Sequence, residues 1–196
     1  CTPVIFAGAK TWAALRKTVK TENTVQFTET RALQGLQPGK VYLFSCWEEE
    51  VGIQPGVLND VGGKYAVRSL QVAAQCLKEG GLDGLVTAPI HKSNTYSENF
   101  PYTGHTPFLK ATFGARDVLM LLYTDALRVG LVTEHLPLSA AAAAVTKEVL
   151  ASKTGLLREA LVRDFGIDKP RIAVLGLNPH AGDEGRIGRE EEDVVK

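Results

Sequence analysis

Cysteines, net charge and long apolar runs are all scarce in this sequence, and each scarcity excludes a class of protein. The 3 cysteines, Cys1, Cys46 and Cys76, are widely spaced and form no CxxC pair, so we expect neither a disulfide framework nor a cysteine metal site. Basic and acidic side chains number 22 each, which argues against nucleic acid as a partner. Apolar stretches stay far below the roughly 20 residues of a membrane helix. These features predict a cytoplasmic protein with neither a membrane nor a nucleic-acid partner.

Three common phosphate and hydrolase motifs are missing as well. Gly182, Gly185 and Gly188 form GxxGxxG after a predicted strand, which differs from the GxGxxG spacing of a dinucleotide fingerprint. The stretch GVLNDVGGK is not a P-loop, and GxSxG does not occur. The sequence therefore gives no support to a P-loop NTPase or a serine hydrolase.

Short apolar runs alternate with helical patterns along the chain. Two stretches predict helices, 64–79 as one helix and 139–165 as one or two, and 124–127 predicts the turn of a hairpin. The runs rich in Val, Leu and Ile that predict strands are Val4–Ala7, Val41–Cys46, Leu85–Thr87, Val118–Tyr123, Arg128–Thr133 and Ile172–Leu177. This order predicts an α/β fold with a mixed, largely parallel sheet flanked by helices. We expect two lobes that share the sheet, 1–98 and 99–196.

All four histidines lie in polar segments outside the predicted helices. His91, His135 and His180 follow predicted strands, and His105 lies in a polar junction. Ligands in open α/β sheets bind beyond the carboxyl ends of strands, so these positions are candidates for a shared site. A single loop histidine is nevertheless more often a surface or hydrogen-bonded residue.

A metal site built on two of these histidines needs at least one further ligand. Asp183, Glu184 and Glu134 are candidates for it, and so is a residue outside this chain. The acidic run REEED at 189–193 predicts instead a solvated helix start, because the helix dipole favours acids there.

Four segments taken together resemble one enzyme family. LVTAPIHK, FPYTGHTPFL, LRVGLVTEHLPL and PRIAVLGLNPHAGDEGRIGREEED occur in the order and spacing of 4-hydroxythreonine-4-phosphate dehydrogenase, an enzyme of pyridoxal phosphate biosynthesis. The likeness runs from about residue 60 to the end and is weaker before that. It implies a fold like that of the isocitrate and isopropylmalate dehydrogenases.

The resemblance also implies a reaction. NAD would oxidise the 3-hydroxyl of 4-phosphooxy-L-threonine, and loss of CO2 would then give 3-amino-2-oxopropyl phosphate. A divalent metal is implied at the hydroxyl, with Zn²⁺ first and Mg²⁺ or Co²⁺ as alternatives; such an ion lowers the pKa of the alcohol. A dehydrogenase of a related four-carbon hydroxy acid phosphate, and a non-catalytic module that binds a small anion, remain alternatives, as does NADP in place of NAD.

Matching the motifs residue by residue implies roles for four side chains. His135 in TEHLPL and His180 in NPHAG match the family's metal ligands. His105 and Thr106 in TGHT match the pair that contacts the substrate.

Four further residues of these motifs have weaker assignments. Lys92 and Asn178 are expected to stabilise the site without binding the metal. His91 is expected to be a loop residue or to contact a metal ligand without binding the metal itself. Glu134 lies where many relatives have a small or hydroxyl residue, so it either supports a ligand or faces water.

The likeness is incomplete at both ends of the chain. A GDPxGIG-like opening and a YHDQG-like segment with the family's third metal histidine are missing, as are most NAD contacts. We therefore expect a chain truncated at both ends, with little turnover by itself. The family also implies a homodimer whose active site is shared between the subunits.

Overall fold

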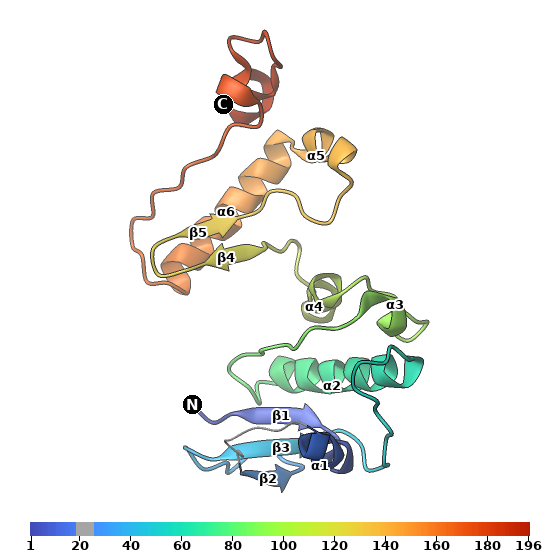
Figure 1. Ribbon diagram of the computed structural model, residues 1–196. Helices are drawn as coiled ribbons and strands as arrows, with labels where there is room; N and C mark the ends of the chain where they lie inside the picture. The colour runs from blue at the N-terminus through green and yellow to red at the C-terminus, as the bar shows by residue number, and fades with distance from the viewer. Residues whose placement is uncertain (19–25) are drawn as a thin grey trace. The chain divides into compact units, whose positions relative to one another are not determined.

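The computed structural model describes residues 1–18 and 26–196, which form two compact units, Cys1–Ala115 and Arg116–Lys196 (Figure 1). The division falls after Ala115, so the TGHT segment and the helix that it begins pack with the first unit. The predicted lobes, 1–98 and 99–196, stay a prediction.

A three-stranded parallel sheet begins the first unit. Its strands lie in the order β1-β3-β2, and their bounds are Val4–Ala7 for β1, Phe27–Thr30 for β2 and Val41–Ser45 for β3. Helix α1, Ala9–Thr18, follows β1 and is fastened to the chain beyond β3, because the Trp47 indole donates a hydrogen bond of 3.1 Å to the Thr11 hydroxyl. The central strand β3 carries Leu43, which is fully buried.

Helix α2, Asp60–Lys78, packs on both of the unit's hydrophobic clusters. It begins at the N-cap Asn59, whose side chain accepts a hydrogen bond of 2.7 Å from the Gly62 N–H. Gly80, with a φ of 77°, lies just beyond its end, where a left-handed glycine commonly terminates a helix. The helix cluster comprises Val67, Leu70, Ala74, Phe100 and Phe108. The sheet cluster comprises Cys46, Trp47 and Val51, against which Tyr65 and Val72 of α2 pack.

Two shorter helices complete the first unit. They are α3, Lys92–Thr95, and α4, His105–Phe113, and both contact α2 (Figure 1). Gly63 of α2 comes so close to α3 that a Cβ on it would lie 1.9 Å from the Asn94 carbonyl oxygen. The Asn94 side chain also donates a hydrogen bond of 2.7 Å to the Asn59 carbonyl. The close approach and this bond fix α3 at the start of α2.

The second unit contains the predicted hairpin. Strands β4, Leu121–Tyr123, and β5, Arg128–Gly130, pair antiparallel, and the Thr124 N–H donates to the Leu127 carbonyl at 2.7 Å across the turn. The stretch 139–165 forms two helices, α5 (Leu138–Ala144) and α6 (Lys147–Arg163). They separate at Val145, which is extended, and Thr146 caps α6 through the Val149 N–H.

The α/β class with largely parallel pairing is confirmed, but several strand boundaries were wrong. β4 and β5 are shorter than predicted, and β2 was not predicted because FTET contains only one apolar residue. Leu85–Thr87 and Ile172–Leu177 form no strand within the described residues. Val86 is 98% exposed and Leu175 is 85% exposed, so neither segment has the neighbours that a buried strand requires. One sheet shared by two lobes stays a prediction.

The cysteines behave largely as packing residues. Cys46 lies in the sheet cluster, where burial raises the pKa of its thiol to about 12, and Cys76 is partly buried. Among the helices formed by residues 1–18 and 26–196, none combines the length and hydropathy that a bilayer crossing needs.

Asp117 fastens the start of the hairpin segment to α6. Its carboxylate accepts hydrogen bonds of 2.8 Å from the Lys153 ammonium and 2.8 Å from the Ser152 hydroxyl. The Lys153 bond, then the Ser152 bond, lower the pKa of Asp117 from 3.8 to about 2. The folded state therefore holds this carboxylate ionised at pH values where the unfolded chain takes up a proton.

This pKa predicts a loss of stability in acid. The contribution of Asp117 should be complete above about pH 5 and lost as the pH falls through about 2, because its folded pKa lies below its unfolded one. The carboxylate is 27% exposed, so we expect about 1–2 kcal/mol after screening. Denaturant unfolding at several pH values should show this slope in the unmodified protein and not in Asp117→Asn. The exposed Asp168→Asn provides the control, and equal slopes for both variants would contradict the assignment.

Candidate functional site

In the first unit, Lys92, His105 and Thr106 gather around the beginning of α4. His105 and Thr106 are the first two residues of this helix, and no side chain caps its N-terminus. Lys92 begins α3, and its Cε lies 3.7 Å from where a Cβ of Gly104 would be. The helix N-terminus, with unpaired N–H groups and a neighbouring ammonium group, suits a small anion such as a phosphate.

His105 is partly buried at this position, and burial lowers the pKa of its imidazole. A neutral ring offers one donor nitrogen and one acceptor nitrogen, which suits hydrogen bonding to a polar substrate. His91 has a different environment: it is exposed, and its Nδ1 lies 2.9 Å from the Ser93 hydroxyl. His91 is the N-cap of α3, and its expected role as a loop residue or as support for a metal ligand stays a prediction.

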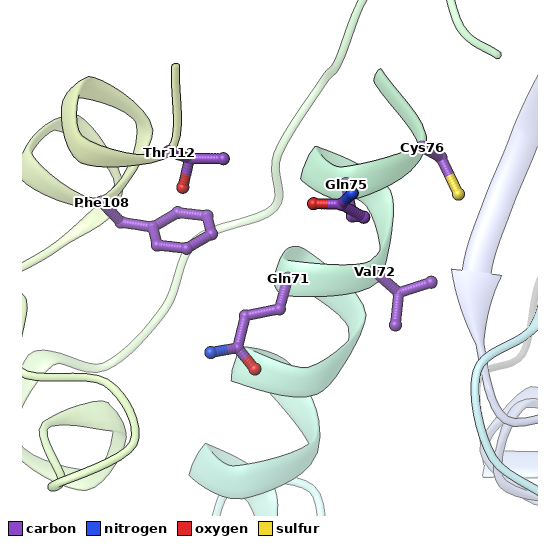
Figure 2. Close-up of a pocket in the computed structure, with 6 residues that line it drawn as sticks. All are labelled: Gln71, Val72, Gln75, Cys76, Phe108 and Thr112. Carbon is purple, nitrogen blue, oxygen red and sulfur yellow. The ribbon is translucent and has the colours of Figure 1, made fainter. Parts of the chain in front are cut away.

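A pocket of about 460 Å³ also lies in the first unit, between α2 and α4 (Figure 2). The residues that line it are uncharged: Gln71, Val72, Gln75, Cys76, Phe108 and Thr112. The sequence singled out none of them for chemistry, so the candidate site lies at the helix start and not in this pocket.

In the second unit, His135 lies in the loop after β5. Its φ of 54° is left-handed, which is costly for a side-chain-bearing residue, and its imidazole is 61% exposed. The Glu134 carboxylate lies 3.5 Å from the His135 Nδ1. Glu134 is 24% exposed, and its Oε2 is buried without another partner among the described residues, so it faces its neighbour more than water.

His180 lies in a strained turn, η1 (Pro179–Gly182). Its φ is 52°, and Ala181, Asp183 and Glu184 are also left-handed, at 51°, 46° and 57°. Each such residue costs roughly 1–2 kcal/mol, so other contacts must hold the turn. The imidazole of His180 is exposed at the tip.

Those contacts come from Glu191 in the short turn η2 (Glu191–Val195). Its Oε1 accepts a hydrogen bond of 2.5 Å from the Asn178 N–H, and its Oε2 accepts one of 2.9 Å from the Asn178 amide. The Asn178 backbone N–H, then its side chain, lower the pKa of Glu191. The sequence predicted a solvated REEED run, and for Glu191 this was wrong, since it is only 3% exposed. No local pattern of the sequence signals this contact, because Asn178 and Glu191 lie 13 positions apart.

His135 and His180 fit a divalent transition ion by donor chemistry, because an exposed imidazole is a ligand for zinc or cobalt. Within residues 1–18 and 26–196, however, no group of three or more His, Cys, Asp or Glu side chains could hold an ion. Asp183, Glu184 and Glu134 thus complete no such group here. The chain offers two nitrogen donors, and a complete site needs a ligand beyond the described residues; a single ion shared by both histidines stays a prediction.

A family model described as pyridoxal phosphate biosynthetic protein PdxA matches residues 1–196. A curated 4-hydroxythreonine-4-phosphate dehydrogenase of Bacteroides thetaiotaomicron is 36% identical over 196 residues, which is 100% of this chain and 53% of the relative. The enzyme of that name from Acidithiobacillus ferrooxidans is 46% identical over 142 residues, 72% of this chain and 43% of its own length. The chain spans about half the length of the curated relatives that it matches.

A solved structure supports the same fold. The crystal structure of 4-hydroxythreonine-4-phosphate dehydrogenase from Klebsiella pneumoniae aligns with a TM-score of 0.84 and 27% identity. The alignment covers 98% of this chain and 58% of that one.

Proposed function

The chain belongs to the family of pyridoxal phosphate biosynthetic protein PdxA, and we propose that the complete protein oxidises 4-phosphooxy-L-threonine with NAD and releases CO2 to give 3-amino-2-oxopropyl phosphate. The observation that carries this proposal is the match over all 196 residues, supported by relatives named for this dehydrogenase activity. The step would serve pyridoxal phosphate synthesis.

The first unit would bind the phosphorylated substrate. Lys92 contributes a positive charge beside the open start of α4, and Thr106 adds a hydroxyl at the same place. His105, kept neutral by burial, would donate or accept a hydrogen bond without adding charge. In this proposal these side chains orient the substrate.

His135 and His180 would hold the divalent ion, with Zn²⁺ preferred over Mg²⁺ because both donors are imidazoles. The chemistry that a bound ion supplies is a lower pKa for the substrate hydroxyl and stabilisation of the charge that follows loss of CO2. The left-handed turns keep both rings at exposed loop tips, where a ligand can reach them. The NAD contacts are expected outside these 196 residues, and a homodimer with a shared site and a cytoplasmic location stay predictions.

A non-catalytic module that binds a small anion is the second candidate. It is favoured by one observation, the lack of a three-ligand metal group among the described residues. Under this alternative the open start of α4 would still bind phosphate, but no oxidation would follow.

The test is NADH formation by the complete protein with 4-phosphooxy-L-threonine, before and after treatment with a chelator. We expect turnover that is lost on chelation and restored by Zn²⁺ or Co²⁺. The related substrate 4-phosphoerythronate, supplied in parallel, distinguishes the neighbouring activity by its kcat/KM. Binding of the substrate without NADH under all metal conditions would support the anion module and contradict the dehydrogenase.

A further inference from the structure

The turn that carries His180 has a left-handed backbone that its sequence disfavours, and contacts from outside the turn stabilise it. Asn178 is the N-cap of η1, a position where asparagine usually accepts a hydrogen bond from the turn's own N–H groups. Here its side chain makes no such bond. Its amide instead donates to two carboxylates, 2.7 Å to Glu190 and 2.9 Å to Glu191. The turn is therefore held from outside.

Glu191 touches the turn on both sides of His180. Before the histidine, it accepts the Asn178 backbone and side-chain bonds. After the histidine, its Oε2 lies 3.1 Å from where a Cβ of Gly182 would be, so a side chain at this position would crowd the carboxylate. Gly182 has a φ of 81°, which also favours glycine. One buried carboxylate thus contacts both ends of the segment with His180 at its tip.

We propose that Glu191 is a positioning residue that fixes the His180 turn and so presents the imidazole to the metal. The inference rests on the proposed role of His180 as a ligand. A carboxylate is needed because both of its oxygens accept, one from the main chain and one from the side chain of the same asparagine. A glutamine can accept only at one end, and its amino group would face the amino group of Asn178.

The experiment uses the complete protein and two glutamine variants with the same change of charge. Glu191→Gln removes one of the two carboxylate oxygens that accept hydrogen bonds from Asn178. Glu192→Gln changes the next residue, which is exposed and lies 3.8 Å from Arg189. Affinity for Zn²⁺ is measured by competition with a chromophoric chelator. We expect Glu191→Gln to bind about 10- to 100-fold more weakly and Glu192→Gln to bind within about twofold of the unmodified protein.

A second readout separates positioning from general loss of structure. The visible spectrum of the Co²⁺-loaded protein reports ligand geometry, and it should change in Glu191→Gln and not in Glu192→Gln. If Glu191→Gln does not fold, as judged by circular dichroism, Asn178→Ala takes its place. This variant keeps the main-chain bond to Glu191 and should show a smaller loss of affinity. Unchanged affinity and an unchanged Co²⁺ spectrum in the folded variant overturn the inference.

His180→Ala, measured in parallel, distinguishes this inference from the proposed function. If His180→Ala loses the metal and Glu191→Gln does not, the positioning role is wrong and the ligand assignment stands. If His180→Ala binds metal as the unmodified protein does, the ligand assignment fails, and the positioning role fails with it.

Discussion

Alanine at His135 or His180 is expected to remove the bound divalent ion from the complete protein and to lower kcat/KM by more than about 100-fold. Loss of a group that merely supports a ligand costs about 10- to 100-fold in metal affinity or activity, and loss of the ligand itself should cost more. Both rings are exposed at loop tips, so their removal opens no cavity in a core. The metal-free variants should therefore unfold at nearly the same denaturant concentration as the unmodified protein stripped of its metal.

Two controls sharpen this prediction. His91→Ala removes an exposed imidazole that is bonded to Ser93, and it should retain a full complement of metal. His180→Asn keeps a residue that tolerates a left-handed φ, so its expected loss of metal would come from the missing imidazole and not from a disturbed turn. Metal content by mass spectrometry and NADH formation provide the measurements. Full metal content in both His135→Ala and His180→Ala would contradict the assignment.

Alanine at Gly63 is expected to destabilise the first unit by about 3 kcal/mol or more. Its Cβ would lie 1.9 Å from the Asn94 carbonyl oxygen and 2.5 Å from the carbonyl carbon, and neither backbone atom can rotate away. Helix α3 would have to move from α2, which would also break the bond from the Asn94 amide to the Asn59 carbonyl. Because Lys92 begins α3, phosphate binding should weaken together with stability.

Gly155→Ala is the matched control for Gly63→Ala. Gly155 lies exposed inside α6 with nothing within 4 Å of a Cβ, so alanine should stabilise that helix by about 0.5–1 kcal/mol. The two tryptophans, Trp12 and Trp47, both lie in the first unit, so their fluorescence follows the unfolding of that unit. An unchanged fluorescence transition in Gly63→Ala would contradict the close packing of α2 on α3.

Local sequence patterns were sufficient to predict the helices and turns that form from residues close together in the chain. The helical pattern over 64–79 predicted α2, and the turn at 124–127 predicted the hairpin. Strands that depend on distant partners were harder. Leu85–Thr87 and Ile172–Leu177 have the composition of buried strands, but a strand exists only where another pairs with it, and within the described residues none does. Conversely, β2 pairs with β3 although it is short and polar.

In the candidate site, too, features set by local sequence could be predicted and features set by distant contacts could not. The sequence placed all four histidines in polar segments outside the predicted helices. His135 and His180 do lie in loops or turns, whereas His105 begins α4. No pattern indicated the left-handed turn at His180 or the burial of Glu191, because both depend on a contact that joins residues 13 positions apart. Neither the sequence nor the structure of this chain identifies a third metal ligand among the described residues.

The position of α2 has a consequence for local unfolding of the first unit. Val67, Leu70 and Ala74 belong to the helix cluster, whereas Tyr65 and Val72 of the same helix pack on the sheet cluster. Neither cluster can release α2 without exposing the other, so local fluctuations should be suppressed along the whole helix. Amide protons of α2 should then be among the slowest to exchange with deuterated solvent, and sheet and helix layers should lose protection together.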